Sequence, residues 1–172
     1  MRRDISIAVI AVLSMGIATM VRATDLSVAV GRTGESTTTY RVGAQWDFQR
    51  NWFESATSRL SGYWDAGYTY WEGDKTSDNH SLSLAPVFVY EFSGGALKPY
   101  VEVGIGIAAF GRTRLEDKQL GSAFQFEDRL GTGLRFAGGH ELGIRAIHYS
   151  NAGIKKPNDG VESYSLYYRR SF

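Results

Sequence analysis

The chain has 172 residues, of which 43% are hydrophobic and 22% charged, and it contains no cysteine. Its 19 basic and 18 acidic side chains give a net charge of +1, without the strongly basic balance of a nucleic-acid-binding protein. The lack of cysteine excludes a disulfide framework and a cysteine-based metal site, and the length suits one domain.

The first 23 residues have the layout of a secretory signal peptide. Arg2 and Arg3 precede an apolar run over residues 5–21, and the small residue Ala23 follows, so we expect cleavage after Ala23. The alternative is an uncleaved membrane anchor, although the run is close to the lower limit of a spanning length. The leader would carry three of the 19 basic and one of the 18 acidic side chains, which leaves residues 24–172 with a net charge of −1.

Eight segments of the mature chain alternate apolar residues with polar or small ones at a period of two. This period is typical of β-strands that have two different faces. In chain order the segments cover residues 25–31, 38–49, 59–72, 80–92, 98–110, 122–137, 140–150 and 161–172. Each is about as long as a tilted membrane-spanning strand, or longer. The pattern predicts an all-β fold, an eight-stranded antiparallel up-and-down transmembrane β-barrel.

The segment 98–110 illustrates the two faces, since Val103 and Ile105 alternate with Glu102 and Gly104. The interior of an eight-stranded barrel is just filled by side chains, and charges can pair there. On the lipid face each charge would cost about 2–4 kcal/mol at mid-bilayer depth. We therefore expect the apolar faces to meet lipid and the charged faces to lie inside, with Asp128 as an exception on an apolar face. A soluble, lipocalin-like barrel with inverted faces is the alternative.

Aromatic residues lie near strand ends on the apolar faces, as in the interfacial girdles of membrane proteins. They are Trp46, Phe48, Tyr68, Tyr70, Tyr90 and Phe92. The final Phe172 resembles the assembly signal of bacterial outer-membrane barrels. These features favour an outer-membrane location, with short periplasmic turns and longer extracellular loops at 32–37, 73–79, 111–121 and 151–160. The connection 50–58 is longer than a periplasmic turn, and we expect a helical turn there.

The stretch HYSNAGIKKPNDGVE, residues 148–162, places His148, Ser150 and Glu162 on the same parity as the lipid-facing residues of the last two strands. A hairpin in which partner numbers sum to 310 sets His148 opposite Glu162. Their Cβ atoms would then be about 4.5–5.5 Å apart. Ser150 would lie about 6.5–7 Å along the same strand. The three side chains are therefore predicted to meet on the outside of the barrel, at its extracellular rim.

These residue types suit a nucleophilic esterase. A serine hydroxyl needs a neighbouring base, which histidine can be near neutral pH, and a carboxylate fixes the histidine tautomer. A G-x-S-x-G elbow is lacking, which excludes an α/β-hydrolase. The alternative is that these polar residues have no catalytic role and only mark the ends of the strands at the barrel rim. We interpret His80 and His140 as rim residues of this kind.

The loop after Ser150 contains candidates for an oxyanion-stabilising or positioning role. Asn151, Asn158 and the main-chain N–H groups around Gly153 are within reach of Ser150. The alternative is turn formation, because Asn and Gly are common loop formers. We expect neither a cofactor nor a metal.

The sequence is similar to the lipid A 3-O-deacylase (PagL) family of Gram-negative outer membranes. The stretches RAIHYSNAGIKKPNDGVESYS, GYWDAGYTYWEG and LAPVFVYEF carry the resemblance, which spans the mature chain. It implies Ser150 as nucleophile, His148 as general base and then acid, and Glu162 as orienting carboxylate, with lipid A of lipopolysaccharide as substrate. The alternatives are a non-catalytic structural or adhesion barrel and a phospholipase-type barrel. A homodimer is left open.

Overall fold

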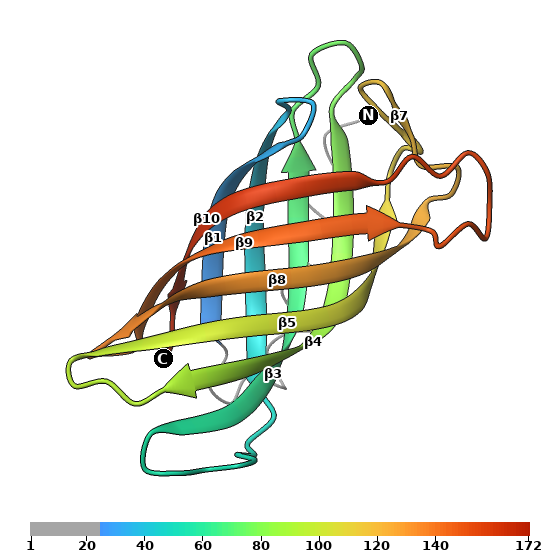
Figure 1. The fold of residues 1–172 in the computed structure, drawn as a ribbon. Coiled ribbons are helices and arrows are strands. Elements are labelled where there is room, and N and C mark those ends of the chain that lie inside the picture. The colour runs from blue at the N-terminus through green and yellow to red at the C-terminus, as the bar shows by residue number, and fades with distance from the viewer. Residues whose placement is uncertain (1–24) are drawn as a thin grey trace, which may run out of the picture.

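The structure is a computed structural model that describes residues 25–172. The expected leader, residues 1–23, lies outside the described residues. Eight long strands close into one antiparallel barrel, which confirms the predicted fold (Figure 1). Its strands are β1 (Asp25–Thr33), β2 (Thr38–Asp47), β3 (Ser58–Trp71), β4 (Asn79–Phe92), β5 (Leu97–Phe110), β8 (Phe124–Phe136), β9 (His140–Ser150) and β10 (Val161–Arg170). A separate hairpin consists of β6 (Arg114–Leu115) and β7 (Lys118–Gln119).

The two ends of the barrel differ in the length of their connections. At the short-turn end, residues 93–96 join β4 to β5 and residues 137–139 join β8 to β9, and β10 ends there beside the start of β1. At the long-loop end the connections are residues 34–37, 72–78, 111–123 and 151–160. The part of the chain that the structure describes has no helix that is long and apolar enough to cross a membrane.

The faces of the strands follow the predicted parity. Along β5, Val103 and Ile105 point outward and are 51% and 69% exposed, whereas Glu102, which precedes Val103, is fully buried. The outer face of the barrel is a broad apolar band, the surface that a barrel presents to lipid. The soluble barrel with inverted faces is therefore wrong for this chain.

Ion pairs fill the inside of the barrel. Arg129 donates hydrogen bonds to Asp65 (2.7 Å) and Glu127 (2.5 Å), and all three side chains are buried. Arg145 donates to Glu102 at 2.6 Å. A buried charge costs free energy unless it is paired, so these contacts explain why charged residues occupy the inward positions of the strands.

An apolar cluster closes the barrel at its long-loop end. We call it the long-loop cluster, and it consists of Trp71, Ala108, Phe110, Leu115, Leu120, Ile147, Tyr149 and Val161. Two of its members come from the connection 111–123, which folds back over the barrel as the β6–β7 hairpin. The alternation pattern does not reveal this hairpin, because each of its strands has only two residues.

The connection between β2 and β3 corrects one expectation. Residues 48–57 contain no helical turn. Trp52 instead forms an isolated bridge with Leu60, with N–O distances of 2.7 and 2.9 Å. The rings of Phe48 and Trp52 pack on Phe88, 5.7 and 6.1 Å away between centroids. Aromatic packing against the outer wall of the barrel thus replaces the expected helix.

The outward face of β5 gives a test of this architecture. Replacing Ile105 with arginine should weaken folding into bilayers by about 2–4 kcal/mol, because a guanidinium group would be placed in the apolar band. Urea-dependent folding into phospholipid vesicles measures the effect, with Ile105→Leu as the matched control. Folding of Ile105→Arg at wild-type stability would show that this face does not meet lipid.

Candidate active site

The register of β9 and β10 brings His148 and Glu162 together. They are cross-strand partners, and Nδ1 of His148 lies 2.8 Å from Oε1 of Glu162. The side chains are 43% and 37% exposed on the outer face of the barrel. Arg145, an inward-facing residue of the same strand as His148, is bonded to Glu102 inside the barrel. The predicted contact is therefore present.

This contact determines how the His148 ring can act. A carboxylate can only accept hydrogen bonds, so Nδ1 of His148 carries the hydrogen that Glu162 accepts. The lone pair of the neutral ring is then on Nε2, which is free to take a proton from another group. The geometry gives His148 the tautomer that a general base requires.

Ser150 is the last residue of β9 and lies on the same outward face, two residues beyond His148. Its cross-strand neighbour on β8 is Phe126. Within residues 25–172 no hydrogen bond joins the hydroxyl group of Ser150 to the ring of His148. Hydrogen bonds between a nucleophile and its base are often long before substrate binds. The two side chains lie two residues apart on β9 and therefore share one face of the strand.

Inward-facing neighbours hold this pair of strand ends in place. Tyr149, between His148 and Ser150, points into the long-loop cluster, and its ring contacts Trp71 and Phe110 at centroid distances of 5.6 and 5.3 Å. Val161, next to Glu162, is fully buried in the same cluster. The alternation of the strands therefore anchors one set of side chains inside and presents His148, Ser150 and Glu162 outside.

The loop 151–160 follows Ser150 directly. Asn151 is fully buried, and its amide nitrogen donates to the main-chain carbonyls of Leu120 (2.7 Å) and Lys155 (2.8 Å). Its main-chain N–H donates to Oδ1 of Asn158 at 2.9 Å. Asn151 thus fixes the start of the loop and orients the amide group of Asn158.

Gly153 has a different environment from the two asparagines. It adopts a φ of +75° and is exposed, and a Cβ atom added there would meet nothing within 4 Å. The structure therefore places Asn151 inside the loop, Asn158 at an intermediate position and Gly153 at the surface.

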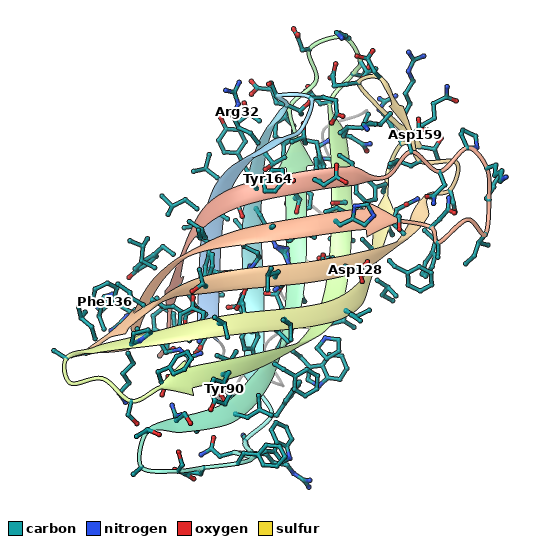
Figure 2. The ribbon with its side chains drawn as sticks, in the orientation of Figure 1. Arg32, Tyr90, Asp128, Phe136, Asp159 and Tyr164 are labelled. Carbon is teal, nitrogen blue, oxygen red and sulfur yellow. The ribbon has the colours of Figure 1, made fainter. Side chains whose placement is uncertain are left out.

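Two residues near His148 were not among the predicted site residues. Gly160, with φ +66°, lies against the ring, and a Cβ atom there would be 2.9 Å from Cε1 of His148. Asp128, labelled in Figure 2, is the cross-strand neighbour of His148 on β8, so that His148 lies between Asp128 on one side and Glu162 on the other. The signal for Asp128 was its place as a carboxylate on an apolar face.

An apolar groove of about 600 Å³ lies on the outer wall below the site. Two of its lining residues, Ala146 and Tyr164, are cross-strand partners one outward position from His148 and Glu162, and Figure 2 shows Tyr164 on the wall of the barrel. The groove is lined by Val101, Leu130, Gly131, Thr132, Ile144, Arg145, Ala146, Tyr164 and Ser165. Its size and apolar walls suit a hydrocarbon chain that lies along the barrel.

Comparisons with known proteins agree on one family. The family model described as lipid A 3-O-deacylase (PagL) matches residues 38–171. The lipid A deacylase PagL of Pseudomonas aeruginosa is 57% identical over 170 residues, 98% of each chain. The lipid A deacylase PagL of Bordetella bronchiseptica is 34% identical over 137 residues, which cover 79% of this chain and 75% of that protein. A crystal structure of the outer-membrane enzyme PagL has a TM-score of 0.83 and 61% identity, over 85% of this chain and 98% of that one.

Proposed function

The chain belongs to the lipid A 3-O-deacylase (PagL) family and is an outer-membrane lipid A deacylase, and we propose that Ser150, His148 and Glu162 are its catalytic triad. The observation that carries this proposal is the 2.8 Å contact between His148 and Glu162 on the outer face of the barrel. A structural or adhesion barrel has no need of a histidine and a carboxylate paired there beside a serine.

The reaction proceeds in two halves. Nε2 of His148 takes the proton of the Ser150 hydroxyl as Oγ attacks the carbonyl carbon of the 3-O-ester. The tetrahedral intermediate collapses, the bond between the carbonyl carbon and the sugar 3-oxygen breaks, and His148 gives the proton to that oxygen, which leaves as the 3-hydroxyl. His148 then takes a proton from the water that attacks the acyl-serine ester and passes it to Oγ of Ser150 as the hydroxy fatty acid leaves. Glu162 stays a carboxylate and stabilises the imidazolium in both halves.

Negative charge on the substrate oxygen needs hydrogen-bond donors. We assign this role to the amide nitrogen of Asn158 and the main-chain N–H of Gly153, both in the loop that follows Ser150. Asn151 has a positioning role, because its main-chain N–H donates to Oδ1 of Asn158 and so leaves the nitrogen of that amide as the end that can donate to substrate. Loss of one such donor typically costs about 2.7–4 kcal/mol in a transition state.

The position of the site on the barrel matches the position of the substrate. The triad is at the long-loop end of the apolar band, which we assign to the outer leaflet. The ester linkages of lipid A lie at the boundary between headgroups and acyl chains. The groove below His148 would take the scissile acyl chain, while water reaches the acyl-serine from the headgroup side. One chain supplies all three residues, so the proposed activity does not require a homodimer.

Mass spectrometry of lipid A tests the proposal. Cells that lack a deacylase and express this protein should lose one hydroxyacyl chain from the 3-position, because only that ester is cleaved. Cells that express equal amounts of folded Ser150→Ala should keep the chain. Identical lipid A from both strains, together with inactivity of the purified wild-type protein in detergent, would rule the function out.

A further inference from the structure

We propose that the β6–β7 hairpin and the turn that follows it, residues 114–121, act as a strap that positions the catalytic loop 151–160 for the reaction. Among residues 25–172, no hydrogen bond joins the strap to His148 or Glu162. Its residues are positioning residues rather than catalytic ones. This inference rests on the proposed function of Ser150 and the loop.

The strap holds the catalytic loop at both of its ends. At the start of the loop, the carbonyl of Leu120 accepts a hydrogen bond from Asn151, the residue after Ser150, at 2.7 Å. At the other end, the N–H of Gln119 donates to Oδ2 of Asp159 at 2.7 Å, and the N–H of Asp159 donates back to Gln119 at 3.2 Å. Asp159 precedes Gly160, which lies against the His148 ring.

Close packing at Gly121 fixes the middle of the loop. Gly121 has a φ of +69°, and a Cβ atom at this position would be only 1.9 Å from the carbonyl oxygen of Pro157 and 3.0 Å from that of Lys155. Any larger residue would force the strap and the loop apart. The backbone of the strap therefore packs directly against the backbone of the loop.

The strap itself is anchored in two ways. Leu115 and Leu120 are buried in the long-loop cluster, 2% and 0% exposed. Glu116 accepts 2.8 Å hydrogen bonds from the N–H groups of Asp74 and Lys75 in the β3–β4 connection. Burial raises the pKa of Glu116, but these donors outweigh it and leave the pKa below its ordinary value. Glu116 is therefore ionised near neutral pH and can hold the strap.

A further ion pair ties the strap to a third connection. Nζ of Lys118 lies 3.1 Å from Oε1 of Glu35 in the β1–β2 connection. The strap is thus fixed by neighbouring loops and by the barrel interior. Figures 1 and 2 show the hairpin beside the β9–β10 loop at the long-loop end, with Asp159 facing it.

The catalytic loop has little packing of its own. Residues 152–157 are all exposed, and the buried side chain of Asn151 is held by the strap. A displacement of about 1 Å in a catalytic group can lower the rate roughly 100-fold. Since the loop contains the donors assigned to the oxyanion, movement of the strap should reduce kcat and leave KM nearly unchanged.

Two pairs of variants test the strap with purified full-length protein and lipid A in detergent micelles. Gly121→Ala should lower kcat roughly 100-fold with KM changed less than about threefold. The matched control is Gly138→Ala at the short-turn end, where φ is +80° and the nearest atom to an added Cβ is 3.5 Å away. It introduces the same backbone strain without a clash and should keep the wild-type kcat.

The second pair concerns the exposed residue Asp159, whose replacement leaves the barrel intact. Asp159→Ala should lower kcat roughly tenfold, whereas Asp159→Asn keeps an acceptor for the N–H of Gln119 and should restore most of it. Folding of every variant is checked by the shift in electrophoretic mobility on heating.

Three results would overturn the inference. One is a wild-type kcat in both folded Gly121→Ala and folded Asp159→Ala. Another is an equal loss in Gly138→Ala, which would assign the effect to backbone strain. The third is an equal loss in Asp159→Ala and Asp159→Asn. If Gly121→Ala fails to fold, the Asp159 pair decides. Activity in Ser150→Ala would instead refute the proposed function, whatever the strap variants show.

Discussion

Ser150→Ala and His148→Ala should each reduce the rate of lipid A deacylation by at least about 10³-fold, because members of a triad act as a unit. The double variant should be little worse than either single variant for the same reason. Both residues lie on the outer face at the ends of strands, outside the buried ion pairs and the long-loop cluster, so the barrel should still fold.

Release of hydroxy fatty acid from lipid A in detergent micelles measures the loss, and heat-dependent electrophoretic mobility verifies folding. His80→Ala is the matched control for His148→Ala. His80 also faces outward at the long-loop end, but it lies on β4 and contacts Tyr68, 2.6 Å from Nδ1 to the hydroxyl oxygen. Substantial activity in folded Ser150→Ala would remove Ser150 from the role of nucleophile.

Glu162→Ala should also be strongly impaired, yet roughly 100-fold more active than Ser150→Ala, as is found when the acidic member of a triad is removed. In the proposed mechanism Glu162 orients His148 and stabilises its charged form but takes no proton from Ser150. Glu162→Asp should fall between the wild type and Glu162→Ala, since the carboxylate is kept but shortened by one methylene group.

Glu162→Gln separates orientation from charge. Its amide can still accept a hydrogen bond from Nδ1 of His148, but it can also donate one and favour the tautomer that leaves Nε2 protonated. Rates at several pH values, measured per folded enzyme, compare the four proteins. An order in which Glu162→Asp is no more active than Glu162→Ala would exclude the orienting role and leave a dyad of Ser150 and His148.

The strands and the contact between His148 and Glu162 could be predicted from the sequence, because period-two alternation and hairpin register are local properties. Parity also flagged Asp128 as anomalous. Its neighbour could not be identified without the register of β8 against β9, which the turn at residues 137–139 sets. The alternation of residues thus predicts which face of the strand a side chain occupies, but it does not predict the neighbour of that side chain on the next strand.

The loops at the two ends could not be predicted in the same way. The strap has only two residues in each strand, and its position depends on contacts far along the chain, such as Glu116 with residues 74–76. The connection 48–57 has no alternation, and its aromatic rings pack against strands from elsewhere in the barrel. Tertiary contacts, rather than local preference, determine both.

The ion pairs that fill the barrel interior determine the route by which lipid A can reach the site. With Asp65, Arg129 and Glu127 packed across the centre, neither lipid nor fatty acid can move along the axis of the barrel. Substrate must therefore reach the outward-facing site by lateral diffusion within the leaflet. The rate of the enzyme in a membrane is therefore governed by the mole fraction of lipid A around its circumference, so that diluting vesicles with buffer should leave the turnover unchanged while diluting them with phospholipid lowers it.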